Sequence, residues 1–266
     1  MLTKEKATEI IKTITKNGIL SFAKKTANKK ATFQVLDLLI PNERKIRNIV
    51  GGLETSLGTT LWEPLAKALA KENGFEVVNS KLLSPEHIPS SVNNILQNII
   101  DDRSAASKQY NAKTSHEAIK NVCQIFVDNP VTVFKKPPRG KGVDIWLRKD
   151  NVNYLFDTKT VQPNISAFTS YMTQVLYWYA YFYTQYPTQQ AEARIVFPYN
   201  PHGGNFWTST KGQGKPLERS NEGWVENDFW NFCTGLDDTY DLIKQSFIDL
   251  RDSGELESEL NRIFYS

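Results

Sequence analysis

Two aspartates and a lysine stand at a spacing that could build a metal site. Asp157 follows Asp144 by thirteen residues, and Lys159 lies two residues beyond Asp157. Two carboxylates held close together repel each other, and a divalent cation between them removes that repulsion. Ligation by oxygen atoms alone favours Mg²⁺. The three residues therefore predict a Mg²⁺ site with a lysine beside it, provided that the chain brings them to one face.

A β-hairpin is the element that must position these residues. Residues 143–147 and 152–156 are rich in β-branched and aromatic side chains, and a short polar stretch separates them. If Asp150-Asn151 forms the turn, Lys149 faces Val152 and, counting outward, Asp144 lies opposite Asp157. Opposed residues are roughly 5 Å apart at Cβ. The two-residue period of a strand returns Lys159 to the same face.

The other face of the hairpin predicts a contact with the core, because it carries only apolar and aromatic side chains: Val143, Ile145, Leu147, Tyr154 and Phe156. A shift of the register by one residue would move Asp144 to that face. The alternative to a metal site is an exposed hairpin on which Asp157 and Lys159 form a surface ion pair.

Helical segments precede the hairpin. Isoleucines at helical spacing predict a helix over residues 3–17 with Gly18 as its end. The lysines after it are either a solvated face or an arm that contacts phosphates: Lys24, Lys25, Lys29 and Lys30. Residues 34–75 predict a connected pair of helical segments. The second begins at Pro41, is interrupted at Gly51-Gly52 and closes at Asn73-Gly74.

The rest of the chain predicts an α/β core. A short strand over 75–78 and a helical stretch over 84–125 come before the hairpin. The tyrosine-rich segment 168–186 predicts a helix buried against a sheet rather than a platform for stacking bases. Residues 194–197 predict the strand that returns onto the sheet. Residues 225–264 predict helices that close the fold.

Composition sets broad limits on the class of protein. The net charge of +3 is only mildly basic and does not by itself indicate a nucleic-acid partner. Cys123 and Cys233 lack metal-ligand spacing and indicate free thiols in a reducing compartment. No apolar run approaches the ~18 residues of a membrane span. We therefore expect a cytoplasmic protein that does not bind membranes.

Two stretches carry a resemblance to a known family. ERKIRNIVGGLETSLGTTLWEPLAKALA and FDTKTVQPN are similar to the TdeIII family of type II restriction endonucleases, over most of residues 33–75 and 142–183. The Asp144, Asp157-x-Lys159 pattern resembles the PD-(D/E)xK nuclease core. The resemblance implies a mixed central sheet flanked by helices, with helical additions at both ends. It also implies an N-terminal arm over 1–32 and an endonuclease domain over 33–266, with its catalytic core in about residues 50–200.

The same resemblance implies roles for individual residues. Asp144 and Asp157 would ligate Mg²⁺, and Lys159 would orient or activate the attacking water. A glutamate from a preceding helix is matched to Glu63, with Glu54 as its rival. A purely structural alternative exists for Glu63, because Thr60-x-x-Glu63 also fits a capping box at the start of a helix.

Cations and polar residues near the hairpin are the candidates for contact with DNA. The loop over 135–142 carries four cations beside the predicted metal site and is either a grip on phosphates or a solvated linker. Segment 198–216 is turn-rich, basic and aromatic, and suits contact with DNA, contact between subunits or an ordinary long loop. The candidates are Lys136, Arg139, Lys141, Gln162, Asn164, His202 and Lys211.

These patterns predict a Mg²⁺-dependent type II restriction endonuclease that cuts double-stranded DNA. The resemblance implies a short palindromic target, GGNCC in the TdeIII family, and a DNA methyltransferase as the functional partner in the same system. A palindrome is matched by a two-fold homodimer. The alternatives are a repair or recombination nuclease with the same core, and a DNA-binding protein without catalysis.

Overall fold

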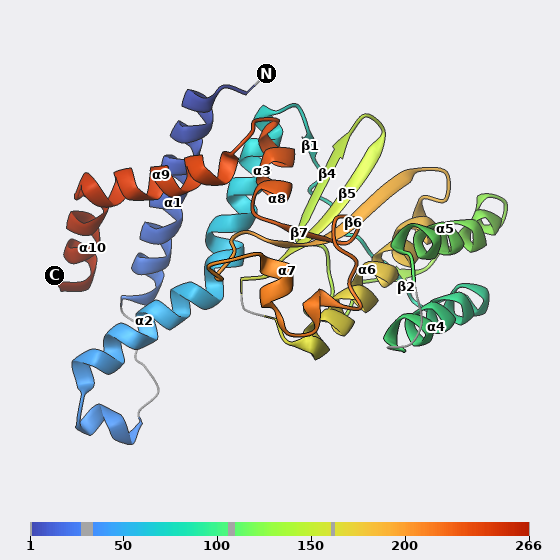
Figure 1. Ribbon diagram of the computed structural model, residues 1–266, viewed down its shortest axis with the longest axis horizontal. Helices are drawn as coiled ribbons and strands as arrows, with labels where there is room; N and C mark the ends of the chain where they lie inside the picture. Colours follow the sequence, from blue (N-terminus) through green and yellow to red (C-terminus); the bar gives the residue numbers. More distant parts are fainter. Residues whose placement is uncertain (1, 28–33, 106–109, 161–162, 266) are drawn as a thin grey trace. The chain divides into compact units, whose positions relative to one another are not determined.

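The computed structural model describes residues 2–27, 34–105, 110–160 and 163–265 (Figure 1). The chain divides into two compact units. The first, which we call the end unit, joins Met1–Asn73 to Trp230–Ser266, and the second, the sheet unit, is Gly74–Phe229. The predicted division into an arm over 1–32 and an endonuclease domain over 33–266 stays a prediction.

Helices from both ends of the chain make up the end unit. Helix α1 packs against α3, α9 and α10, so the first helix is part of this unit's own packing. Helix α8 (Asn227–Thr234) crosses the boundary between the two units. The other elements are α1 (Lys4–Thr26), η1 (Val35–Leu38), α2 (Pro41–Leu57), η2 (Gly58–Trp62), α3 (Glu63–Glu72), α9 (Thr239–Asp252) and α10 (Glu255–Tyr265).

Three glycines that predicted helix breaks lie inside helices. Helix α1 continues through Gly18, where a Cβ atom would lie 2.5 Å from the carbonyl oxygen of Thr60. Gly18 therefore allows two helices to approach closely, and the predicted end of the helix there is wrong. Helix α2 also runs through Gly51-Gly52 without a break. The predicted start at Pro41 and the closure at Asn73-Gly74, with Gly74 at φ +83°, are confirmed.

A mixed sheet of five strands forms the centre of the sheet unit, in the order β1-β4-β5-β6-β7. Pairing is antiparallel from β1 to β5 and parallel from β5 to β7. The parallel step from β5 to β6 passes through α6 (Ile165–Gln185), which confirms the predicted crossover. The strands are β1 (Glu76–Val77), β4 (Ile145–Lys149), β5 (Val152–Thr158), β6 (Gln190–Phe197) and β7 (Gly223–Val225).

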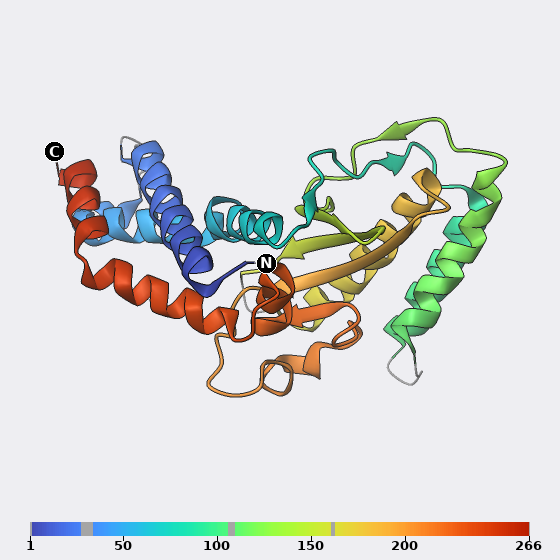
Figure 2. The same cartoon turned by 90° about the horizontal axis from the view of Figure 1, so that it is seen from above.

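Helix α6 lies along one face of this sheet, as Figure 2 shows, and α4 and α5 pack against α6. Its eight aromatic residues make the helix apolar nearly all round, and the prediction of a helix buried against the sheet is confirmed. The unit also contains β2 (Ser84–Pro85), α4 (Ser90–Ser104), α5 (Ala112–Val122), η3 (Cys123–Val127), β3 (Phe134–Lys135), α7 (Phe206–Ser209) and η4 (Lys211–Gly214).

Both faces of the hairpin are covered, which corrects the prediction of a single core-facing side. Trp146 and Leu155 share the face of the aspartates and are buried in the cluster that contains α6. On the opposite face, the ring of Phe156 lies 5.8 Å from that of Trp224 and 5.4 Å from that of Phe229. The predicted α/β class with helices on a mixed sheet is confirmed. None of the described helices is long and apolar enough to cross a membrane.

Candidate active site

The hairpin has the register that the sequence predicts. Asp150 and Asn151 form the turn at φ values of 50° and 63°, and positive φ at both central residues is the geometry that matches the twist of the strands. Lys149 pairs with Val152, and the pairing continues outward to Ile145 and Phe156. Beyond that pair, the N–H of Asp144 donates to the carbonyl of Phe156 at 3.0 Å. Regular pairing ends there: Asp144 stands one residue before β4, and Asp144 and Ile145 both meet Phe156. Asp144 therefore lies beside the end of β5 that carries Asp157, and its place directly opposite Asp157 stays a prediction.

Asp157 and Lys159 face the same side and touch. The Nζ of Lys159 donates to the Oδ2 of Asp157 at 2.5 Å. Asp157 is 3% exposed, so this ion pair is not the surface pair that the alternative interpretation required. The ammonium of Lys159 also lies 5.4 Å from the ring centre of Tyr171 on α6. Burial, followed by the negative charge of Asp157, raises the pKa of Tyr171 to about 12, so its hydroxyl stays protonated beside the carboxylate.

Helix α6 also supplies a glutamine to Asp157. The Nε2 of Gln174 donates to the same Oδ2 atom at 2.7 Å. Gln174 and Tyr171 were missed from the sequence, because they lie in a segment dominated by tyrosines and apolar residues. One signal was present: Gln174 is a polar residue on a helix that is apolar nearly all round.

The cationic loop before the hairpin is tied to the same helix. Lys141 donates from its N–H to the carbonyl of Pro138 at 3.0 Å in a turn that has Gly140 at φ +74°. Its Nζ donates to the Oγ of Ser170 at 2.8 Å, and its carbonyl accepts from the Nε1 of Trp178 at 2.9 Å. The predicted loop is confirmed from residue 136 onward, whereas Lys135 belongs to strand β3.

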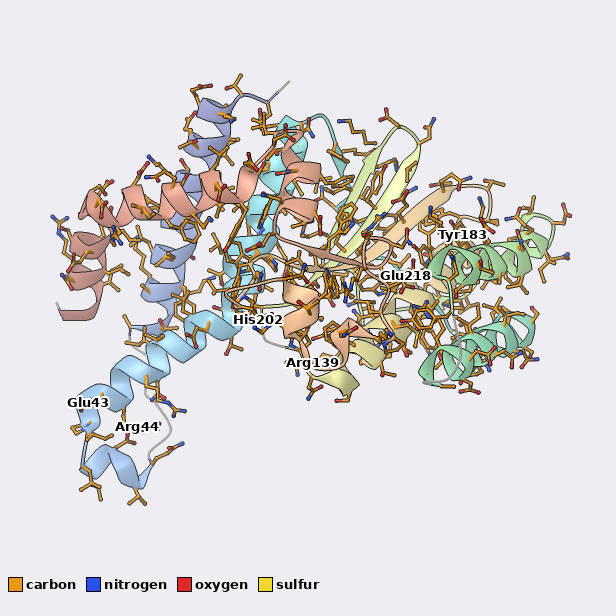
Figure 3. All side chains as sticks on the ribbon, in the orientation of Figure 1. Glu43, Arg44, Arg139, Tyr183, His202 and Glu218 are labelled. Atoms are coloured by element: carbon orange, nitrogen blue, oxygen red, sulfur yellow. The ribbon has the colours of Figure 1, made fainter. Side chains whose placement is uncertain are left out.

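The two remaining cations of this loop, Lys136 and Arg139, are exposed. In Figure 3, Arg139 and His202 are drawn toward one end of the sheet unit and Tyr183 toward the other. The loop that carries the two exposed cations leads directly into Asp144 along the chain.

The donor set of the site suits a hard divalent cation. Within the described ranges, no group of three or more His, Cys, Asp or Glu residues could hold a metal ion. Mg²⁺ is commonly bound through one or two carboxylates and keeps several of its waters. Both hydrogen bonds to Asp157 end on Oδ2. Among the described residues, none donates a hydrogen bond to its Oδ1.

Glu63 and Glu54 lie in the end unit, whereas the aspartates lie in the sheet unit. Glu63 is largely buried, with 14% of its side chain exposed, and its carboxylate lies 3.8 Å from the Nζ of Lys67. The capping box at Thr60 is wrong, because Thr60 lies within the π-helical turn η2 and the helix continues from there into α3. Glu54 is exposed on α2.

The other candidates for DNA contact are spread over two segments. Asn164 caps α6, and its side chain accepts from the N–H of Ala167 at 2.9 Å. His202 lies in the loop after β6, and its Nε2 is buried without a hydrogen-bond partner among the described residues. The backbone of Lys211 begins η4. Gln162 lies outside the described residues.

The loop after β6 is attached to the end of β5. The hydroxyl of Tyr199 donates to the carbonyl of Thr160 at 2.7 Å. Since Thr160 follows Lys159 directly, this bond brings the start of the segment over 198–216 to the candidate site.

Comparison with known proteins adds one finding to this geometry. A family model described as "Type II restriction endonuclease, HinfI" matches residues 3–250. That range contains the whole sheet unit and most of the end unit, and it includes Asp144, Asp157 and Lys159. No curated protein and no solved structure matches the chain.

Proposed function

Since this chain belongs to the HinfI family of type II restriction endonucleases, we propose that it hydrolyses phosphodiester bonds of double-stranded DNA with Mg²⁺, through a PD-(D/E)xK site. The observation that carries the proposal is the hairpin register. It holds as predicted out to the pair of Ile145 and Phe156, each of which is the chain neighbour of one aspartate, and the ammonium of Lys159 lies on the Asp157 carboxylate at 2.5 Å. An exposed hairpin would not need this buried ion pair.

The three residues divide the work at the site. Asp144 and Asp157 would hold Mg²⁺, which when bound stabilises negative charge on a phosphate and lowers the pKa of a bound water. Lys159 supplies a cation at the edge of the site, with 21% of its side chain exposed. From there it can donate to the attacking water or to the scissile phosphate. Helix α6 shields the buried side of Asp157 from bulk water.

The polar residues around the site are proposed to hold the duplex. Lys136 and Arg139 are exposed and can meet phosphates, and Lys141 would do so from a position fixed by Ser170. Such contacts set affinity and register on the duplex rather than sequence preference. The remaining candidates for DNA contact are Gln162, Asn164, His202 and Lys211.

The target and the assembly are finer proposals. A short palindrome cut on both strands is matched by a homodimer, since two copies bring two sites to two equivalent phosphates. The sequence GGNCC depends on the resemblance to the TdeIII family, and the family model that matches is a different one, HinfI. The target is therefore best determined from the cut ends. A DNA methyltransferase that protects the same sequence is the expected functional partner.

Digestion of unmethylated plasmid in the presence of Mg²⁺ tests the proposal. We expect discrete fragments whose sequenced ends share one short palindrome. Cutting without a common sequence would indicate a nuclease that reads DNA structure, and binding without cutting would indicate a protein that only binds DNA. Either result would overturn the proposed activity.

Variants of the hairpin assign the activity to the site. Asp144→Asn and Asp157→Asn should each abolish cleavage and leave DNA binding measurable, because each removes a metal ligand but no cation. Asp150→Asn is the matched control, since Asp150 is an exposed aspartate at the turn of the same hairpin. Near-normal cutting by either of the first two variants would remove the metal assignment.

A further inference from the structure

Gln174 is a polar side chain in an unusually apolar setting. It is 4% exposed, and its neighbours Met172 and Val175 on α6 are fully buried. A buried amide without a hydrogen-bond partner destabilises the folded state. The folded protein can therefore hold a glutamine at this position because its amide has a hydrogen-bond partner.

The partner of Gln174 is the carboxylate of the candidate metal ligand. Its Nε2 donates to the Oδ2 of Asp157 at 2.7 Å, and the Nζ of Lys159 donates to the same atom at 2.5 Å. One oxygen thus receives two donors, one from the helix that covers the sheet and one from its own strand. Two donors on a single atom restrict rotation of the carboxylate and keep Oδ1 apart from both bonds.

The amide of Gln174 is neutral, so its role differs from that of the charged ammonium of Lys159. The lysine already balances the charge of Asp157, so charge compensation does not require a second donor. An amide adds orientation without removing the negative charge that attracts a cation. In metal sites generally, residues that do not contact the metal form hydrogen bonds to the ligands and so fix the orientation of those ligands.

The same helix also holds the other side of the site. Ser170 and Trp178 bind the side chain and the carbonyl of Lys141, which lies three residues before Asp144. Ser170, Gln174 and Trp178 are spaced four residues apart, which places them on one face of a helix. This face of α6 therefore contacts Asp157 near the end of β5 and Lys141 in the loop that leads to Asp144.

From this geometry we propose that Gln174 is a positioning residue that orients the Asp157 carboxylate for the divalent cation. The inference rests on the proposed function, and it deepens that function by adding a residue outside the Asp144, Asp157 and Lys159 set. Gln174 acts through Asp157 and is not itself a catalytic residue.

Two substitutions test this role in the full-length protein. Gln174→Met keeps the volume and removes the donor, whereas Gln174→Asn keeps an amide but withdraws it by about 1.5 Å, one carbon–carbon bond. Gln185→Met is the matched control. Gln185 is on the same helix, and its Nε2 donates to the carbonyls of Leu83 and Tyr181 at 2.7 and 2.8 Å, away from Asp157.

Binding of Mn²⁺, followed by electron paramagnetic resonance without DNA, is the primary measurement, because Mn²⁺ accepts the same oxygen ligands as Mg²⁺. We expect both Gln174 variants to raise the dissociation constant by about 10- to 100-fold. The Mg²⁺ concentration for half-maximal single-turnover cleavage should rise in parallel. Metal-free DNA binding, and all three measurements for Gln185→Met, should stay within about twofold of wild type.

The outcomes separate this inference from the proposed function. Wild-type protein that neither binds Mn²⁺ nor cuts DNA would overturn the proposed function itself. An active wild type beside a folded Gln174 variant with unchanged Mn²⁺ affinity would overturn only the positioning role, even if that variant melts at a lower temperature. If circular dichroism shows that Gln174→Met does not fold, Gln174→Asn decides the question by the same criterion.

Discussion

Replacing Lys159 by methionine tests the role of the lysine in the candidate site. The change removes the ammonium that lies 2.5 Å from the Oδ2 of Asp157 and keeps a side chain of similar length. Among the described residues, Gln174 is then the one remaining hydrogen-bond donor to Asp157. The variant should therefore lose both stability and cleavage, each by a different amount and for a different reason.

The loss of stability follows from the burial of the pair. The two side chains are 21% and 5% exposed, so solvent screens them only in part. A hydrogen bond to a charged group contributes about 1.5–3 kcal/mol. A loss of about 2 kcal/mol lowers the melting temperature by about 4–8 °C in a chain of this size. Loss of a positioned group in proton transfer lowers cleavage by about 10²- to 10⁴-fold.

Mg²⁺ should restore part of the stability that Lys159→Met loses, but none of the cleavage that it loses. An ion at 100 times its dissociation constant stabilises the folded state by about 2.7 kcal/mol. Without Lys159, Asp157 has more negative charge to offer the ion. We therefore expect Mg²⁺ to raise the melting temperature of Lys159→Met by at least as much as that of wild type, while single-turnover cleavage stays low.

The assay pairs differential scanning fluorimetry with single-turnover cleavage, each with and without Mg²⁺. Lys120→Met is the control, because the Nζ of Lys120 donates to the neutral amide of Gln190 at 2.9 Å. We expect that control to melt within about 2 °C of wild type, as for most surface changes, and to cut normally. Cleavage by Lys159→Met within about tenfold of wild type would refute the role given to the lysine.

Three further predictions concern the surroundings of the site. Neutralising Arg139 and Lys141 together should reduce the log–log salt dependence of DNA binding by about 0.9 for each phosphate that the variant no longer neutralises, and an unchanged slope would make the loop a linker. Glu63→Gln should leave the melting temperature nearly unchanged, because the helix already runs through position 63 and needs no cap there. A fall in the cleavage rate of this variant by about a hundredfold would assign Glu63 to catalysis. If only Glu54→Gln loses cleavage, the catalytic role belongs to Glu54 instead. Burial and then Lys120 lower the pKa of His116 to about 4. The unfolded state therefore binds more protons between about pH 6.5 and pH 4, and stability should fall as pH falls through that window. Melting curves of wild type and His116→Gln at about pH 7 and pH 5 measure this difference, and an equal loss in both would contradict it.

Local chemistry decided what could be predicted of the hairpin. Asp150-Asn151 determined the turn, and the turn determined every pair outward to Ile145 and Phe156. A strand period of two then placed Lys159 correctly. No partner from elsewhere in the chain was needed for that result. The buried helix α6 was predictable for a similar reason, since a segment that is apolar nearly all round can only be covered.

Partners distant in sequence decided what could not be predicted. Gly18 looks like a helix end until Thr60 is placed against it. Thr60-x-x-Glu63 has the pattern of a capping box, but the preceding residues are already helical, so the backbone N–H groups there need no cap. Gln174 could be found as a polar residue in an apolar helix, but nothing local connects it to a carboxylate seventeen residues earlier.

The end unit contains both ends of the chain, so it cannot be completed until translation is nearly finished. Ion pairs from Lys12 to Asp249 and from Lys16 to Glu255 join α1 to helices near the other end of the sequence. The ribosome must first synthesise residues 74–229, which takes roughly 8–30 seconds at about 5–20 residues per second. During that interval α1 can pack against α3 but lacks α9 and α10, whereas by its end the whole sheet unit has been synthesised. The candidate active site can thus fold on the ribosome before the end unit does, and assembly of that unit waits for residues 230–266.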